Sequence, residues 1–185
     1  MKRFFFKILA VACLLGPLSV AVADTGTFTV VQMCDPQLGM TDYRENVCSL
    51  EQAVKQANLL NPEFVVICGD MVNTPNDTSF SDFMKIREAF SVPCHCVPGN
   101  HDVGGPPTST SLARYRSAIG DNWFAVRRPG VRFLVLDSQL FKWPQAGDTD
   151  RQLAWLRTEL AGAKAGNEAV YVCLHIPPFV TSPEE

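Results

Sequence analysis

Four short apolar segments, each followed at once by polar side chains, constrain the fold of this chain more than any other feature. They are residues 27–33, 64–68, 92–97 and 169–174. The second segment is continuously apolar, which is typical of a parallel strand covered on both faces. Residues with helical spacing between the first three segments give the order β-α-β-α-β. Right-handed crossovers in such an α/β chain place the carboxyl ends of the strands along one edge of a sheet.

Apolar spacing and capping residues predict the other elements. A helix over 45–60 is expected to have one buried face, formed by Val47, Leu50, Val54, Ala57 and Leu60. Ser81 or Asp82 is expected to cap a second helix that ends near residue 90. A β-hairpin is expected over 123–126 and 131–136. Asp150 is expected to cap a later helix with three leucines on one face: Leu153, Leu156 and Leu160.

The polar residues at the four strand ends are the candidate site. They are Asp35, Asp70, the run Asn100-His101-Asp102, and His175. A single aspartate after a strand is more often a helix cap or turn former, and a single histidine there is more often structural. Four such ends point instead to a shared partner, because unpaired polar groups are costly to bury. Oxygen and imidazole ligands without thiolate suit manganese, iron or zinc, and two such ions can share one carboxylate.

The order of these motifs resembles that of the calcineurin-like metallophosphoesterases. The motifs are Asp35-Pro36-Gln37, Gly69-Asp70, Gly99-Asn100-His101-Asp102 and His175-Ile176-Pro177, and the resemblance extends over residues 27–179. Within the family, the chain looks closer to the branch that includes the calcineurin-like phosphoesterase domain-containing serine/threonine phosphatase. The resemblance implies an α/β fold of the metallophosphoesterase type. This is a two-sheet α/β sandwich, here lacking the C-terminal part of the second sheet.

The resemblance also implies a metal site with two divalent or trivalent ions, manganese, iron or zinc. Asp35 would bind the first ion and Asp70 would bridge both, while Asn100 and His175 would bind the second. Gln37 is the fifth expected ligand, at a position where most family members have a histidine. An amide oxygen is a neutral and poorer ligand than imidazole.

The activity implied by the resemblance is metal-dependent hydrolysis of phosphomonoesters, or of phosphodiesters, by a metal-bridged hydroxide. His101 would face the phosphoester substrate and protonate the leaving alkoxide, a role that imidazole suits. Asp102 is the second expected catalytic residue and would hold the turn. Phosphoprotein phosphatases pair the acid histidine with an aspartate. Here that position holds Asn73, which can orient an imidazole but supports its positive charge less.

A second interpretation stays open, because the family's C-terminal Gly-His-x-His is not found after His175. That motif supplies one ligand to each metal. The alternative is a truncated or degenerate protein that binds a metal or a phospho-ligand and is catalytically impaired. In either case the loops over 104–110 and 141–149 are expected to flank the pocket and to determine its specificity.

The first 23 residues have the pattern of a signal peptide, which leaves a phosphoesterase domain over 24–185. A basic start precedes an apolar run over 8–20, and Ala21-Val22-Ala23 forms the cleavage pattern. The protein is therefore expected to be exported, to the periplasm or out of the cell. Cys13 leaves a lipoprotein anchor as a weaker alternative. The apolar run is too short for a stable membrane span.

The net charge argues against nucleic-acid or membrane partners, and the cysteine spacing argues against a structural zinc site. Removal of the signal peptide changes the net charge from −3 to −6, whereas nucleic acids and anionic membranes attract basic surfaces. Six cysteines remain, and the absence of a C-x-x-C pair argues against a structural zinc site. Most of them are expected to be free and buried, and His95 is expected to pack within a strand. The three tryptophans are expected in the core or at its rim. The sequence does not indicate an oligomeric state.

Overall fold

The computed structural model describes residues 27–178, so the expected signal peptide lies outside the described residues. The first sheet consists of β1 (Val30–Met33), β2 (Phe64–Cys68) and β3 (Cys94–Val97), with β2 in the centre. All three strands are parallel, and β2 is buried along its whole length. The predicted β-α-β-α-β arrangement is therefore confirmed.

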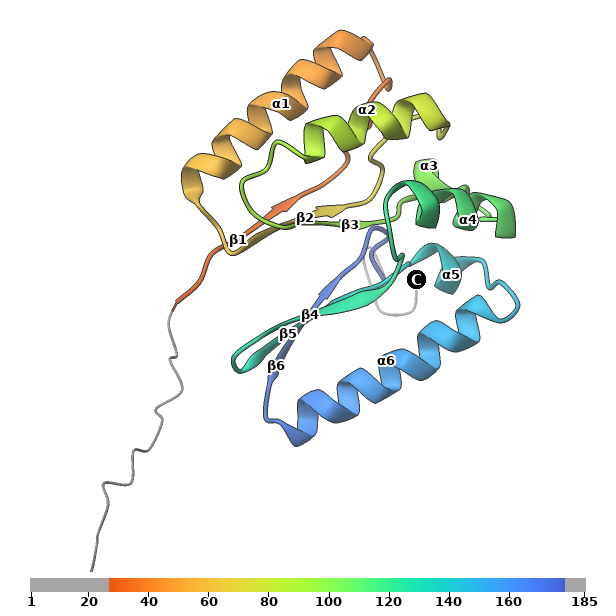
Figure 1. Cartoon of the computed structure of the whole chain (residues 1–185). Coiled ribbons are helices and arrows are strands. Elements are labelled where there is room, and N and C mark those ends of the chain that lie inside the picture. The colour runs from red at the N-terminus through yellow and green to blue at the C-terminus, as the bar shows by residue number, and fades with distance from the viewer. Residues whose placement is uncertain (1–26, 179–185) are drawn as a thin grey trace, which may run out of the picture.

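Helices cover one face of this sheet. Figure 1 shows α1 (Tyr43–Leu60) and α2 (Asp77–Arg87) above the strands, and α4 (Ser109–Ala118) beside them. Their apolar side chains pack against one face of β2 and β3 in a core that includes Leu50, Val54, Ala57, Val65, Ile67, Phe80, Phe83, Cys96 and Tyr115. Leu60 does not join this core and is 64% exposed, because α1 ends there as Asn61 turns into the left-handed region at φ 45°.

The second sheet contains β4 (Phe124–Arg128), β5 (Val131–Val135) and β6 (Ala169–Cys173). The β4–β5 pair is the predicted antiparallel hairpin, and β5 pairs with β6 in parallel. The connection to β6 contains α5 (Gln139–Lys142) and α6 (Asp148–Ala165). Figure 1 shows α6 along the outer face of this sheet, on the side away from α1 and α2.

Apolar side chains join the two sheets face to face. Phe64 of β2 meets the Phe133 ring of β5 edge to face, with a centroid distance of 4.9 Å. His95 packs between Phe64 and Phe124, with centroid distances of 5.4 and 5.5 Å. Val66, Cys68 and Val97 contact Val135 nearer the carboxyl edge. These contacts confirm the two-sheet α/β sandwich, with His95 packed as expected.

Two helix starts differ from the prediction. Asn76, and not Ser81 or Asp82, caps α2: its side chain accepts the N–H of Ser79, and Ser79 Oγ accepts the N–H of Asn76. The helix α6 follows Gly147 and begins before Asp150.

The buried face of α6 is also more polar than predicted. Leu160 is 44% exposed, whereas Gln152 is fully buried and Glu159 is 8% exposed. Arg132 of β5 donates to the Glu159 carboxylate at 2.7 Å, and this buried ion pair helps to set the orientation of the helix.

Replacing Asn76 with alanine is expected to lower the free energy of unfolding by about 1 kcal/mol, because the first turn of α2 loses its side-chain acceptor. Ser81→Ala is the matched control, since Ser81 is exposed inside the same helix. Urea denaturation of the two variants measures the difference. Equal stability of the two variants would contradict the assigned cap.

The six cysteines of residues 27–178 are all free thiols. Cys68, Cys94 and Cys96 are buried, Cys173 is partly buried, and Cys34 and Cys48 are exposed, so half of the six thiols are buried and not most of them as expected. Cys34 lies directly after β1, a strand at the edge of the sheet that has no fully buried residue. Among residues 27–178, no helix has the length and apolar character needed to cross a membrane.

Candidate metal centre

The candidate site lies where strands of both sheets end. Asp35, Asp70 and His175 each follow a strand by two residues, after β1, β2 and β6 respectively. Asn100 opens α3 (Asn100–Val103), a short turn of helix after β3. In Figure 1 the carboxyl ends of these strands lie on the side of the sheets that is nearest to α3. The first sheet therefore supplies three candidate residues and the second sheet supplies His175.

The side chains of these residues converge. Ligand atoms of Asp35, Asp70 and His175 all lie within 4.8 Å of one another. His175 Nε2 lies 3.6 Å from Asp70 Oδ2 and 3.1 Å from Asn100 Oδ1, and His175 Nδ1 lies 3.6 Å from Asp35 Oδ1. The Asp70 side chain is 7% exposed, whereas that of Asp35 is 50% exposed. The cluster is thus closed on the Asp70 side and open to solvent on the Asp35 side.

The backbone that carries the aspartates has unusual torsion angles. Asp35, Gln37 and Asp70 have φ values of 52°, 42° and 52°, in a region that residues other than glycine rarely occupy. The two loops hold each other, because the N–H of Gln37 donates to the carbonyl of Asp70 at 2.8 Å. Strained backbone of this kind is concentrated at functional sites.

Two glycines allow the close approach of the ligands. A Cβ atom at Gly69 would lie 2.7 Å from the Cβ of His175 and would overlap its imidazole. A Cβ atom at Gly99 would lie 2.8 Å from the Cγ of Asp70. Glycine is therefore required at both positions by the side chains that converge there.

Replacing Gly69 with alanine is expected to weaken metal binding about 10- to 100-fold by displacing His175. Gly130→Ala is the matched control, since Gly130 has a similar φ of 72°, against 84° for Gly69, and no atom lies within 4 Å of its added Cβ. Both variants are expected to lose about 1 kcal/mol of stability from the left-handed backbone. Calorimetric titration with Mn²⁺ separates them, and equal affinity in both variants would contradict the close packing of His175.

His175 is oriented by a carbonyl group. The Cys68 carbonyl oxygen lies 3.1 Å from His175 Nδ1 and can accept a proton carried there. In the tautomer protonated at Nδ1, the lone pair of Nε2 faces Asp70 Oδ2 and Asn100 Oδ1, where a cation would lie between these atoms. Such a bond from the outer nitrogen of a histidine is typical of metal ligands.

His101 has a different environment from His175. Its backbone N–H donates to Asp70 Oδ1 at 2.9 Å, and its ring nitrogen Nδ1 lies 2.9 Å from the carbonyl oxygen of Asn73. Nδ1 is thus the donor, and Nε2 remains available for a substrate. Asn73 orients the imidazole through its backbone, while its side chain accepts from Gln37 Nε2 at 3.4 Å. The ligand role of Gln37 stays a prediction.

Asp102 lies behind the turn and not in the open part of the site. It is 1% exposed, and its two oxygens accept the N–H groups of Gly99 at 2.8 Å and of Val72 at 3.3 Å. Burial raises the pKa of Asp102 to about 8, and the hydrogen bond from Gly99 opposes this increase. These contacts agree with a residue that positions the turn, and we treat Asp102 as such.

The sequence model of the calcineurin-like phosphoesterase family matches residues 20–185 of this chain. The chain belongs to the calcineurin-like phosphoesterase family. Serine/threonine-protein phosphatase CPPED1 of Danio rerio is 31% identical over 187 residues, which is 87% of this chain and 60% of that protein. The 3',5'-cyclic adenosine monophosphate phosphodiesterase CpdA of Escherichia coli (strain K12) is 30% identical over 161 residues, which is 79% of this chain and 54% of that protein. The chain thus spans at most 60% of the length of these two relatives.

The fold has a counterpart among solved structures. The crystal structure of a dimetal phosphatase from Danio rerio matches with a TM-score of 0.64 and 21% identity, covering 82% of this chain and 70% of that one. This similarity supports the metallophosphoesterase-type sandwich described above.

The residues of this family member fit a metal cation. The donors are two carboxylates, one amide oxygen and one imidazole, a set that suits divalent first-row ions. Among the described residues, neither Asp35 nor Asp70 forms a salt bridge with a lysine or arginine. A buried carboxylate such as Asp70 needs a positive partner, and a cation supplies one.

Three supporting contacts were not predicted from the sequence: the carbonyls of Cys68 and Asn73, and Ser138. Ser138 Oγ accepts the N–H of Ile176 at 2.9 Å and so holds the segment that follows His175. The carbonyls leave no signal in the sequence, since every residue has one. Ser138 follows the end of β5, so its place after an apolar strand was the one available signal.

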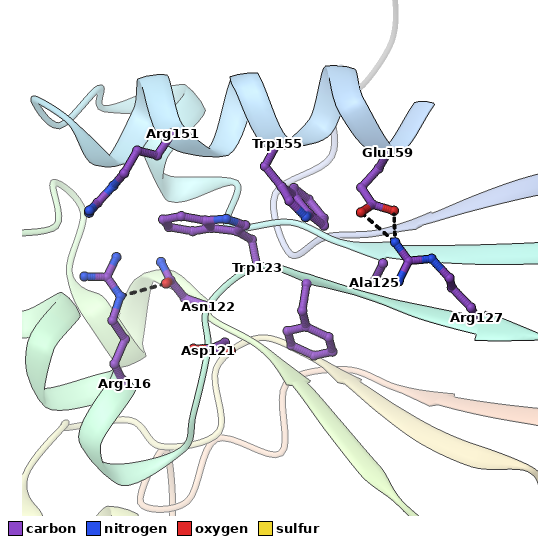
Figure 2. Close-up of a pocket in the computed structure, with 10 residues that line it drawn as sticks. Arg116, Asp121, Asn122, Trp123, Ala125, Arg127, Arg151, Trp155 and Glu159 are labelled. Carbon is purple, nitrogen blue, oxygen red and sulfur yellow. Dashed lines mark hydrogen bonds and ion pairs between the residues drawn. The ribbon is translucent and has the colours of Figure 1, made fainter. Parts of the chain in front are cut away.

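A separate cavity of about 600 Å³ lies beside β4 and α6 (Figure 2). Trp123 and Trp155 form its apolar part, and no candidate metal ligand lines it. Its three arginines are paired within the protein: Arg127 with Glu159 at 2.7 Å, Arg116 with Asn122 at 2.9 Å, and Arg151 with Asp148. We therefore describe it as a surface hollow apart from the candidate centre.

Proposed function

We infer that this protein is a metal-dependent phosphoesterase that hydrolyses phosphomonoesters. The observation that carries the proposal is the convergence of Asp35, Asp70, Asn100 and His175 from two sheets next to His101. Hydrolysis of an anionic ester needs charge neutralisation and an activated water, and ions held in this donor set supply both when they are bound.

In the proposed ligand assignment, two ions would share Asp70. Asp35 would hold the first, with Gln37 as its neutral neighbour, and Asn100 and His175 would hold the second. Asp70 fits the shared position because its Oδ2 faces His175 and the Asp35 carboxylate lies within the same cluster. Manganese, iron or zinc suits these donors.

His101 is the proposed general acid. Because Nδ1 donates to the Asn73 carbonyl, the ring is held with Nε2 free to carry the proton that the leaving alkoxide receives. The N–H of His101 donates to Asp70, so the acid and the shared carboxylate are fixed relative to each other.

The choice of monoesters over diesters rests on the relatives. The relative with the greater coverage is named a serine/threonine-protein phosphatase, and the second is named a phosphodiesterase. A second candidate function is binding of one metal or of a phospho-ligand without efficient turnover. It is favoured by Gln37, which would offer the first ion only a neutral amide oxygen, while its Nε2 donates to Asn73 Oδ1 at 3.4 Å.

The test is hydrolysis by the protein loaded with Mn²⁺, Fe²⁺ or Zn²⁺, with p-nitrophenyl phosphate and bis-p-nitrophenyl phosphate as substrates. We expect faster turnover of the monoester and about two bound ions per chain by elemental analysis. One ion per chain and no turnover would support the binding function instead. Turnover that persists in excess chelator would contradict both.

We also propose that the protein is exported after cleavage of its signal peptide. The basic start, the apolar run and Ala21-Val22-Ala23 support secretion to the periplasm or out of the cell. N-terminal sequencing of the protein from the exported fraction is expected to begin near Asp24, and an intact Met1 there would contradict cleavage.

A further inference from the structure

We propose that Trp143 lines the part of the site that receives the alcohol portion of the substrate, and that it favours phosphoesters of aromatic alcohols. The proposal rests on the proposed phosphoesterase function. Trp143 follows α5, in one of the two loops expected to flank the pocket, and is half-buried.

The rim of the Trp143 indole reaches the candidate metal ligands through Gly105. A Cβ atom built on Gly105 would lie 2.9 Å from Cη2 and 3.2 Å from Cζ3 of Trp143, and 3.6 Å from the Cβ of Asn100. The outer edge of the indole and the Asn100 side chain therefore both pack against Gly105. Asn100 Oδ1 in turn lies 3.1 Å from His175 Nε2. The side chain of Asn100 thus lies between the Trp143 indole and His175.

Trp143 is also fixed relative to the second sheet. Its backbone N–H donates to the carbonyl of Gln139 at 2.8 Å, and Gln139 is fully buried. Ser138, at the start of the same turn, accepts the N–H of Ile176, next to His175. The tryptophan is therefore held by the segments that carry both ligands of the proposed second ion. A side chain carried on a backbone held in this way is suited to select between substrates.

The chemistry of this wall favours an aromatic ester. The indole offers a flat apolar face for stacking of an aromatic ring. Lys142 Nζ lies over one face of the Trp143 ring, 4.7 Å from its centroid, and adds a positive charge there, so stacking is expected on the opposite face. An anionic phosphate joined to an aromatic ring matches this combination, whereas an aliphatic alcohol gains little from the indole.

The experiment compares kcat/KM for phenyl phosphate and glycerol 2-phosphate in the Mn²⁺-loaded protein. Trp143→Ala is expected to lower the value for phenyl phosphate about tenfold and the value for glycerol 2-phosphate less than about twofold. Trp143→Phe is expected to restore most of the loss. Trp155→Ala is the control, because Trp155 lies in the separate cavity, and it is expected to leave the ratio of the two substrates unchanged.

An equal decrease for both substrates would overturn the proposal, since it would show a structural role for Trp143. An unchanged ratio would overturn it as well. If the wild-type protein hydrolyses neither substrate, the proposed function fails by itself, and calorimetric titration then tests this inference. In that case Trp143→Ala should weaken binding of phenyl phosphate but not of inorganic phosphate, and equal binding in both proteins would overturn the inference.

Discussion

Replacing Asp70 with asparagine is expected to remove bound metal and hydrolysis together. Asp70 is the most buried carboxylate of the cluster, and its two oxygens face the N–H of His101 at 2.9 Å and His175 Nε2 at 3.6 Å. The amide keeps the shape of the side chain but removes the charge that two cations would share. We expect kcat/KM to fall on the order of 1,000-fold, which is the size of effect seen when a main electrostatic contribution is lost. Elemental analysis and steady-state kinetics measure both losses.

The matched control for this substitution is Asp150→Asn. Asp150 is exposed in the first turn of α6, outside the cluster of candidate ligands, and undergoes the same chemical change. It is expected to keep full metal content and activity. If the Asp70 variant bound as much metal as this control, the assignment of Asp70 as the shared ligand would be wrong.

Replacing His101 with alanine is expected to keep the metal and to lower kcat about 100-fold or more with alkyl phosphates. The hydrogen bond to Asp70 comes from the backbone N–H of His101, which alanine retains. Only the imidazole is removed, and with it the proton for the leaving alkoxide. Metal content by elemental analysis and kcat with glycerol 2-phosphate test the two parts of this prediction.

The leaving group supplies an internal control for His101. A p-nitrophenolate leaves readily without a proton, so loss of a general acid should slow p-nitrophenyl phosphate much less than an alkyl phosphate. An equal loss for both esters would show that His101 acts on the phosphoryl group instead. Loss of metal in the alanine variant would show that His101 has a structural or ligand role.

The parallel sheet and the convergence of the candidate ligands could be predicted from the sequence. A continuous apolar run such as β2 has few other stable positions than the centre of a covered sheet. Once three such strands are parallel, the residues that follow them must lie at one edge, which is why Asp35, Asp70 and Asn100 come together. Their metal-binding roles remain to be tested.

Other features depend on partners that lie far away in the sequence. The leucines of α6 suggested an apolar face, but Arg132 in β5 binds Glu159, and the buried pair places Leu160 toward solvent. His101 was expected to rely on the residue at position 73, and it does so through a carbonyl that any residue would provide. Residue identity does not encode such contacts, because they arise only when the loops have folded.

The candidate ligands come from both sheets, and this links cation binding to folding. His175 follows a strand of the second sheet, whereas Asp70 and Asn100 follow strands of the first, so the proposed second ion, held by these three residues, would bridge the two halves of the sandwich. A cation that binds only the native state at 100 times its dissociation constant adds about 2.7 kcal/mol to the stability of that state. Conversely, the apolar contacts of Phe64 and Val66 with the second sheet hold the donors close together before any ion arrives. Core packing between the sheets is therefore itself a determinant of metal affinity, at positions that never touch the metal.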